Sequence, residues 1–483
     1  MTVIAPRTAF FPPKLERDRD DVLIVREVPW QDPLVAFAPF ADDPVAALLH
    51  GDGKNEMGRW SYLAASPFST LTVDADLNSF VDGNPIAGDA FHLLRDTLGK
   101  YSFTSKTTPA PFCGGAVGFF SYELGRLVEK LPAPRHGATS PAMVVGLYDV
   151  VAAFDHIERK TWVMSTGFPE ADLDRRTTRA HQRAQWLIDQ ISDASPASLN
   201  TTEARWSSDR TRDHIERAVS NTIEYINAGD IFQANMTQRY TAKRPEDVTA
   251  WDLFRRLRHT VSSPFGAYVA GTLTFQVLSA SPERFLQVSQ KGAIETRPIK
   301  GTRPRHTDPS ADEALAEELA NSTKDLAENL MIVDLMRNDI SRVCDPGSVA
   351  VPHRCAVETF AHVHHLVSIV TGQLHQDKTA VDLLRACFPG GSVTGAPKVR
   401  AMEIIHEQEP VARGPYCGAI GWIGFDGAMD TSIVIRNLTV DGDKVIAQAG
   451  GGIVSDSTPA LEYEEAMVKI RPLLSVLDPT ALA

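Results

Sequence analysis

Two segments in the C-terminal half of the chain place carboxylates where they could bind a metal ion. In LEYEEAMVKI (461–470), a helix would present Glu462, Glu465 and Lys469 on one face, because they are spaced i, i+3 and i+7. Two carboxylates on one face can bind a hard cation such as Mg²⁺. Glu328, in the helical segment KDLAENLMIVDLMRNDI, is a third carboxylate beside an apolar stripe. The plainer alternative is an ordinary surface ion pair between Glu465 and Lys469, with Glu328 at the edge of a core.

Two further residues have the right type for acid–base or nucleophilic chemistry. Glu283, in SASPERF (279–285), lies between two strand-like runs, where partial burial would raise its pKa and suit it to general acid catalysis. Lys300, in ETRPIKGTRPR (295–305), follows Ile299 and precedes Gly301, which fits the end of a strand that opens on a cavity. A lysine buried there would have a depressed pKa and could act as a nucleophile. A salt bridge for Glu283 and a solvated Lys300 are the alternatives.

Two glycine-rich segments could bind an anion through backbone N–H groups. PGGSVTGAPKVRAMEII (389–405) has a glycine-rich turn before a helix, but Ala396-Pro397 stands where a nucleotide-binding P-loop needs Lys and then Ser or Thr. AGGGIVSDSTP (449–459) places three glycines after a strand, where the backbone can approach a carboxylate closely. Plain turns are the alternative for both segments. The chain carries no nucleophile elbow, HExxH motif or dinucleotide fingerprint.

Composition excludes several classes of protein. The chain has 483 residues, 43% of them hydrophobic, which is ordinary for a globular protein. Its net charge is −13, so a polyanionic ligand must be held by local cations or a bound metal and not by the overall field. We find no long basic run, so nucleic-acid binding is not expected. The longest apolar stretch, 143–154, is too short to span a membrane. The five cysteines form no CxxC motif, which predicts reduced thiols in the cytoplasm.

The order of predicted elements indicates how these residues are positioned. A segment rich in Ser, Thr, Asn and Ala predicts a linker at 191–208, between an N-terminal region at 1–190 and a catalytic domain at 209–474. In that domain the sequence predicts hairpins over 265–296, a helix over 311–343 and further strands after 419. Strands grouped with strands, and helices with helices, favour an α+β fold.

The segments between residues 209 and 474, taken in their order along the chain, resemble the sequences of the chorismate-utilising enzymes. The matching segments are DIFQANMTQR, ASPERF, RPIKGTRPR, ENLMIVDLMRNDISRV, HHLVSIVTG, GSVTGAPKVRAMEII, GPYCGAIGW, SIVIRNL, QAGGGIVSDS and EYEEAMVK. Two N-terminal segments are similar to the amino-terminal part of the large subunits of aminodeoxychorismate and anthranilate synthases. They are LLHGDGKNEMGRWSYLAASP and GGAVGFFSYELGR. The resemblance implies an anthranilate-synthase-like fold, in which two antiparallel β-sheets pack as a sandwich with outer helices.

The resemblance also implies a role for each candidate residue, with Mg²⁺ as cofactor and chorismate as substrate. Glu328 and Glu465, with Glu462 in support, match the magnesium-binding glutamates. Glu283 matches the general acid at the C4 hydroxyl of chorismate. The remaining matches hold a substrate carboxylate (Arg436, Lys469, and the amides of Gly451 and Gly452) or line the ring (Gly301, His365, Ser392 and Tyr416).

Two positions favour one branch of the family. Lys300 stands where the resemblance implies lysine in aminodeoxychorismate synthases and alanine in anthranilate synthases; the lysine would attack C2 of chorismate. Ala234 stands where enzymes that use water are expected to carry a lysine. The resemblance therefore implies conversion of chorismate and ammonia to 4-amino-4-deoxychorismate, for 4-aminobenzoate and folate synthesis. We find no amidotransferase signature, so a glutamine amidotransferase subunit would supply ammonia, and a separate aminodeoxychorismate lyase would follow. Anthranilate synthase component I and a non-catalytic chorismate-binding subunit are the alternatives.

Overall fold

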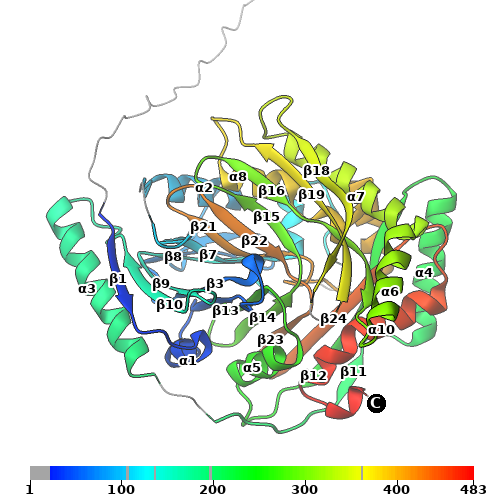
Figure 1. The fold of residues 1–483 in the computed structure, drawn as a ribbon, viewed down its shortest axis with the longest axis horizontal. Helices are drawn as coiled ribbons and strands as arrows, with labels where there is room; N and C mark the ends of the chain where they lie inside the picture. Colours follow the sequence, from blue (N-terminus) through cyan, green and yellow to red (C-terminus); the bar gives the residue numbers. More distant parts are fainter. Residues whose placement is uncertain (1–21, 105–107, 135–137, 195–197, 361–362, 483) are drawn as a thin grey trace, which may run out of the picture.

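The computed structural model describes residues 22–104, 108–134, 138–194, 198–360 and 363–482, which form two large antiparallel sheets with helices around them (Figure 1). Each sheet has 12 strands among these residues. The first sheet runs in the order β1 (Ile24–Val28), β10 (Lys160–Ser165), β9 (Val150–Asp155), β3 (Trp60–Ala64), β2 (Ala47–His50), β13 (Phe265–Ala270), β14 (Phe275–Ser281), β23 (Asn437–Asp441), β24 (Lys444–Ile453), β12 (Gln233–Lys243) and β11 (Trp206–Ser208), with β20 (Gly395–Ala396) paired to β12.

The second sheet brings together strands from both ends of the chain. Its order is β17 (Ile299–Pro304), β19 (Val363–Gln373), β16 (Ala293–Thr296), β15 (Arg284–Val288), β22 (Met429–Ile433), β21 (Ala419–Gly424), β7 (Gly115–Phe120), β8 (Met143–Tyr148), β4 (Ser69–Val73), β5 (Ser79–Val81) and β6 (Asn84–Ile86), with β18 (Ala350–Thr359) paired to β19. The predicted α+β class, with two antiparallel sheets and outer helices, is confirmed.

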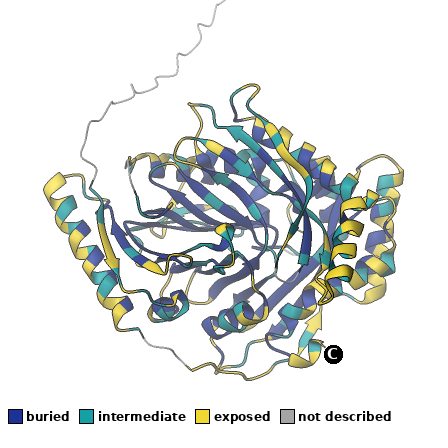
Figure 2. Cartoon of the chain, viewed as in Figure 1, coloured by how far each residue is buried: buried dark blue, intermediate teal, exposed yellow. Residues whose placement is uncertain are grey.

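Helices cover the outer surfaces of the two sheets. They are α1 (Pro33–Phe37), α2 (Ala90–Gly99), α3 (Leu173–Ser192), α4 (Arg212–Asn227), α5 (Ala250–Thr260), α6 (Pro309–Asn321), α7 (Thr323–Ser341), α8 (Ala380–Cys387), α9 (Lys398–Gln408) and α10 (Pro459–Leu474). Helix α3 lies beside β1 at one end of the molecule, opposite α4, α6 and α10 (Figure 1). Figure 2 shows buried strands at the centre and exposed outer faces on the helices. No helix of the described residues is both long and apolar enough to cross a membrane.

The main core lies between the two sheets and includes residues from both sides of the predicted linker. Phe119 of β7 packs against Phe275 of β14 with ring centroids 5.9 Å apart, and Tyr62 of β3 contacts Trp422 of β21 at 6.1 Å. Complete burial of one such side chain contributes about 2 kcal/mol. The N-terminal strands and the C-terminal strands therefore stabilise each other through one shared core.

The segment predicted as a linker, 191–208, contains regular structure at its end. Residues 206–208 form β11, which pairs with the far end of β12, and residues 195–197 lie outside the described residues. Helix α3 extends to Ser192. Since strands before and after this segment share both sheets, its ends are held by the sandwich. The division of the chain into three regions stays a prediction from the sequence.

Two connections cross from the first sheet to the second side by side. One joins β14 to β15 and carries Glu283; the other joins β22 to β23 and carries Arg436. The amide of Ile433 donates to the carbonyl of Glu283 over 3.1 Å, and the amide of Ala280 donates to the carbonyl of Arg436 over 3.0 Å. These bonds fix the two predicted site residues in adjacent backbone segments between the sheets.

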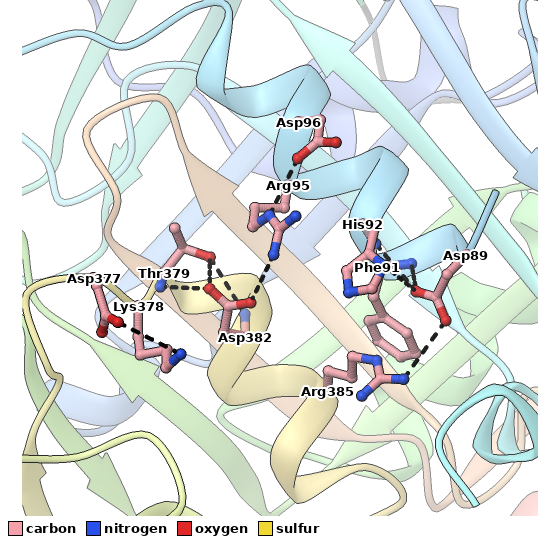
Figure 3. Close-up of polar contacts among 10 residues, drawn as sticks. All are labelled: Asp89, Phe91, His92, Arg95, Asp96, Asp377, Lys378, Thr379, Asp382 and Arg385. Atoms are coloured by element: carbon pink, nitrogen blue, oxygen red, sulfur yellow. Dashed lines mark hydrogen bonds and ion pairs between the residues drawn. The ribbon is translucent and has the colours of Figure 1, made fainter. Parts of the chain in front are cut away.

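Two salt bridges join α2 of the N-terminal part to α8 of the C-terminal part (Figure 3). Arg95 of α2 contacts Asp382 at 3.4 Å, and Arg385 of α8 contacts Asp89 at 3.7 Å. Asp89 is the N-cap of α2 and accepts hydrogen bonds from two first-turn amides, whereas Asp382 completes the capping box of α8 by accepting from the amide and hydroxyl of Thr379. Each aspartate therefore stabilises the start of its own helix and links it to the neighbouring helix. This arrangement fixes α8, which leads directly into the glycine-rich loop at 388–397.

Candidate active site

Lys300 is placed by an irregularity in the edge strand β17. Ile299 pairs with Val367 and Thr302 with His365, so two residues of β17 oppose one residue of β19 between them. A bulge of this kind re-aims the side chains that it contains. Gly301 has a φ of +81°, and a Cβ there would lie 2.9 Å from Cγ of Asp325 in α7. Glycine is therefore required at position 301, both for the bend in β17 and for the close approach of this strand to α7. The bend sets the direction of the neighbouring Lys300 side chain.

Ser392 connects the amino group of Lys300 with the carboxyl group of Glu283. Nζ of Lys300 donates to the backbone carbonyl of Ser392 over 3.4 Å, and the side chain of Ser392 hydrogen-bonds Glu283. Ser392 lies in the 3-10 turn Gly391–Val393, within the loop that the sequence singled out for its glycines. The structure thus brings together a candidate nucleophile, a candidate acid and a serine from three separate segments.

Burial shifts the pKa values of both Glu283 and Lys300. Burial raises the pKa of Glu283 to about 7, against the opposing effects of its hydrogen bond to Ser392 and of the nearby Lys300. Burial also lowers the pKa of Lys300, although the carboxylates of Glu328 and Glu283 partly offset this effect. A carboxyl group with a raised pKa can donate a proton, and a lysine with a lowered pKa is more often an uncharged amine.

Gly452 provides the space beside Lys300. A Cβ at this position would lie 3.3 Å from Nζ of Lys300 and 2.2 Å from Nε2 of Gln233. Gln233 at the start of β12 is fully buried, and neither polar atom of its side chain has a hydrogen-bond partner among the described residues. An unpaired buried amide is costly unless something binds it, so Gln233 is a further candidate for contact with substrate.

The structure corrects our argument from Ala234. Its side chain is buried in an apolar cluster with Val219 of α4 and Ile404 of α9, on the opposite face of β12 from Gln233. Successive side chains of a strand point to opposite faces, so Ala234 cannot report which nucleophile the site accepts. Gln233 was not predicted as a site residue, although it stands one residue earlier in the segment DIFQANMTQR.

Glu462, Glu465 and Lys469 share one face of α10, as their spacing predicts, and this face packs against Gly451. A Cβ at Gly451 would lie 3.2 Å from Oε2 of Glu462, 3.7 Å from Oε1 of Glu465 and 3.8 Å from Nζ of Lys469. Nζ of Lys469 donates to Oε1 of Glu465 over 2.7 Å and to the carbonyl of Gly450 over 3.1 Å. Burial acts to raise the pKa of Glu465, but the ammonium groups of Lys469, Lys324 and Lys300 bring it below its ordinary value.

Glu328 of α7 and Glu462 of α10 approach the same ammonium group. Nζ of Lys324 lies 4.0 Å from Oε1 of Glu328 and 3.5 Å from Oε1 of Glu462. Burial raises the pKa of Glu328, and Lys300 and Lys324 act in the opposite direction. Oε1 of Glu462 also accepts a 2.6 Å hydrogen bond from Ser457. Lys324 did not emerge from the sequence, because a lysine in a helical first turn carries no signal of its own.

The three glutamates match magnesium in donor type, since all of their ligand atoms are hard carboxylate oxygens. Among the described residues, however, no three His, Cys, Asp or Glu side chains are grouped as a metal site. Mg²⁺ commonly binds one or two protein carboxylates and completes its shell with water and substrate oxygens. Glu328, Glu462 and Glu465 therefore fit a site that protein and substrate build together, and they do not form a closed site by themselves.

The remaining predicted residues fall into two groups. His365 is buried, shares a 2.9 Å hydrogen bond with Thr302 and contacts the backbone of Gly301; burial lowers its pKa to about 4, so it stays neutral. Arg436 has a φ of +50°, and burial lowers its pKa, with no carboxylate among the described residues offsetting the effect. Such an arginine suits a carboxylate ligand. Tyr416 is buried beside Cys417, and no described contact joins it to Lys300 or Glu283.

A cavity of about 880 Å³ lies away from this cluster, between the two sheets. Its lining includes His50, Arg284, Glu295, Trp422 and Asp430, and none of the predicted site residues. Arg284 spans the cavity wall, where it contacts Asp430 at 3.0 Å and Glu295 at 3.3 Å. We therefore base the candidate active site on the cluster around Lys300 and not on the size of a cavity.

Comparisons with known proteins indicate the family of this chain. The model of the family described as chorismate binding enzyme matches residues 51–475. The aminodeoxychorismate synthase component 1 of Klebsiella aerogenes is 42% identical over 459 residues, which cover 93% of this chain and 98% of that protein. The anthranilate synthase component 1 of Acetivibrio thermocellus is 34% identical over 468 residues, 93% of each chain. The crystal structure of anthranilate synthase component I from Streptococcus pneumoniae TIGR4 superimposes with a TM-score of 0.76 at 30% identity, and the match covers 86% of this chain and 92% of that one. The chain belongs to the family of chorismate binding enzymes.

Proposed function

We propose that this protein is the large subunit of an aminodeoxychorismate synthase. It would convert chorismate and ammonia to 4-amino-4-deoxychorismate and water. The observation that carries the proposal is the contact of Lys300 and Glu283 with the two ends of Ser392, its carbonyl and its side chain. The 42% identity to the Klebsiella aerogenes protein over nearly its whole length supports the same activity.

Lys300 would act as nucleophile and Glu283 as general acid. The lone pair of Nζ would form a bond to C2 of chorismate, the ring double bond would shift, and the C4–oxygen bond would break. Glu283 would give its proton to the departing hydroxyl, which leaves as water. Ammonia would then attack C4, the electrons would return through the ring, and the bond between C2 and Lys300 would break. The carboxylate of Glu283 would take up the proton that the incoming ammonia loses.

The other predicted residues would hold chorismate in the correct orientation. Arg436, Lys469 and the backbone amides of Gly451 and Gly452 would supply positive charge and donors for a carboxylate. Residues Gly301, His365, Ser392 and Tyr416 would line the ring. Glu328 and Glu465, with Glu462 in support, would hold Mg²⁺, which would neutralise the second substrate carboxylate. The chain's own contribution is to position these oxygens and to keep the reacting centre away from water.

The proposed partners follow from the chemistry of the reaction. Ammonia would come from a separate glutamine amidotransferase subunit, and the name component 1 of the relatives supports a second component. The product would need an aminodeoxychorismate lyase to become 4-aminobenzoate. We propose a cytoplasmic location, since all five cysteines are free thiols.

Anthranilate synthase component I is the second candidate, and the similarity to such enzymes from Acetivibrio thermocellus and Streptococcus pneumoniae favours it. That reaction places the amine at C2 and releases pyruvate. The presence of Lys300 argues against it, because a lysine bound at C2 would block attack there by ammonia. A subunit that only binds chorismate would have no use for a buried acid beside a lysine.

A product assay separates these candidates. The purified chain would receive chorismate, Mg²⁺ and an ammonium salt at alkaline pH, with aminodeoxychorismate lyase added to half of each sample. The proposal predicts that 4-aminobenzoate forms only in the samples that received the lyase. Anthranilate formed without lyase would establish the second candidate, and magnesium-dependent chorismate binding without any product would favour the binding subunit.

A further inference from the structure

Lys324 stands in an unusual place for a lysine. It is the second residue of α7, whose first turn exposes backbone N–H groups and carries the positive end of the helix dipole. A lysine there is unfavourable for the helix, whereas the next residue, Asp325, is favourable. Lys324 is therefore not explained by the local stability of α7.

The partners of Lys324 come from two different helices. Its Nζ lies 4.0 Å from Glu328 of α7 and 3.5 Å from Glu462 of α10, and these carboxylates raise the pKa of Lys324. The two glutamate side chains are only 12% and 6% exposed, while the lysine side chain is 45% exposed. The carboxylates are fixed in the protein, and the lysine reaches them from solvent on a long flexible stem.

We propose that Lys324 is a built-in counter-ion that occupies the cation position between Glu328 and Glu462 and must leave when magnesium binds. This inference rests on the proposed magnesium site. The ammonium group neutralises two nearly buried carboxylates that would otherwise repel each other, and its exposed stem lets it swing outward. Competition from this group keeps the affinity for a free metal ion low until the oxygens of a bound substrate complete the site.

Direct metal binding tests this competition without any turnover. We would titrate the full-length protein with Mn²⁺ in the absence of chorismate and measure the free ion by electron paramagnetic resonance. Lys324→Gln should bind Mn²⁺ about tenfold more tightly than the wild type, because two partly exposed ion pairs no longer compete with the metal. Lys324→Arg keeps the positive charge and should bind Mn²⁺ like the wild type.

Lys378 offers a matched control. It pairs with Asp377 at 3.7 Å on the surface, and its side chain is 39% exposed (Figure 3). Lys378→Gln removes the same charge from the protein but should leave Mn²⁺ binding unchanged. Circular dichroism of each variant checks that the fold is intact, which we expect because residue 324 lies at an exposed helix start.

The outcomes distinguish this inference from the magnesium proposal. Equal Mn²⁺ affinities for wild type and Lys324→Gln would overturn the inference and leave the metal site standing. Equal gains in Mn²⁺ affinity for Lys324→Gln and Lys378→Gln would show that the effect comes from the net charge of the protein, and this result would also overturn the inference. If no protein binds Mn²⁺, with or without chorismate, the metal site and the inference both fail, while the product assay still judges the amination reaction separately.

Discussion

The amino group of Lys300 lies 3.4 Å from the carbonyl oxygen of Ser392, and the side chain of that serine hydrogen-bonds Glu283. One residue of the glycine-rich loop therefore orients both the candidate nucleophile and the candidate acid. Neither residue is close to the other in sequence, and their pKa values are shifted toward each other by burial.

Glu283→Gln should abolish most activity and yet stabilise the fold at alkaline pH. The pKa of Glu283 rises from 4.5 when unfolded to about 7 when folded, so folding favours its protonated form. Below pH 4.5 both states are protonated; above pH 7 both are ionised, and the folded state bears the full cost of the buried charge, roughly 3 kcal/mol. The wild type therefore loses stability as the pH rises from about 4.5 to about 7, and the variant lacks this loss.

Denaturant unfolding at pH 5 and pH 8 measures this difference in both proteins. The free energy of unfolding of the variant should exceed that of the wild type clearly at pH 8 and only slightly at pH 5. A variant that gains nothing at pH 8 would show that Glu283 is not buried as a charged group. The rate of amination should fall about 10²- to 10⁴-fold, as is typical when a general acid is removed.

Gly452→Ala should slow catalysis without unfolding the protein. The new Cβ would lie 2.2 Å from Gln233 and 3.3 Å from Nζ of Lys300, so both side chains must move. A shift of about 1 Å at a reacting group can cost about 10²-fold in rate. Gly99→Ala is the matched control, since a Cβ there meets no atom within 4 Å. Steady-state kinetics that are equally unaffected in both variants would remove Gly452 from the site.

Glu465→Gln should raise the magnesium concentration needed for half-maximal activity by about tenfold, because the site loses one negatively charged carboxylate ligand. Glu464→Gln is a close control: Glu464 is the neighbouring residue, its side chain is 50% exposed against 52% for Glu465, and it pairs with Arg212 instead. A magnesium titration that shifts equally in the two variants would refute the assignment of Glu465.

Lys398→Met should destabilise the protein by about 3 kcal/mol, since it leaves the buried carboxylate of Asp339 without its main partner. Nζ of Lys398 donates to Asp339 over 2.6 Å and to the carbonyl of Cys387 over 2.8 Å, and both charged side chains are buried. These bonds join the two ends of the loop that carries Ser392. Adding Asp339→Asn should restore part of the lost stability in a denaturant titration; a double variant less stable than the single one would contradict this account.

Some of the site could be predicted from sequence because local spacing determines it. The shared face of Glu462, Glu465 and Lys469 follows directly from helical periodicity. Glu283, Lys300 and Ser392 were singled out one by one, but their contact depends on strands that cross between the sheets, which no local pattern encodes. Ala234 misled us because the strand register, and not the residue type, decides which side chain faces the substrate. Lys324 and Gln233 could not be predicted as site residues from the sequence, because only the folded chain shows which groups they contact.

The most direct test of the account compares the wild type with Lys300→Ala. Both would receive chorismate, Mg²⁺ and an ammonium salt, and the products would be separated after addition of aminodeoxychorismate lyase. The account predicts 4-aminobenzoate from the wild type, and from the variant a rate at least about 10²-fold lower with chorismate affinity nearly unchanged. Lys300→Ala that forms 4-aminobenzoate at the wild-type rate would contradict the nucleophilic role of Lys300, and anthranilate from the wild type would contradict the proposed function itself.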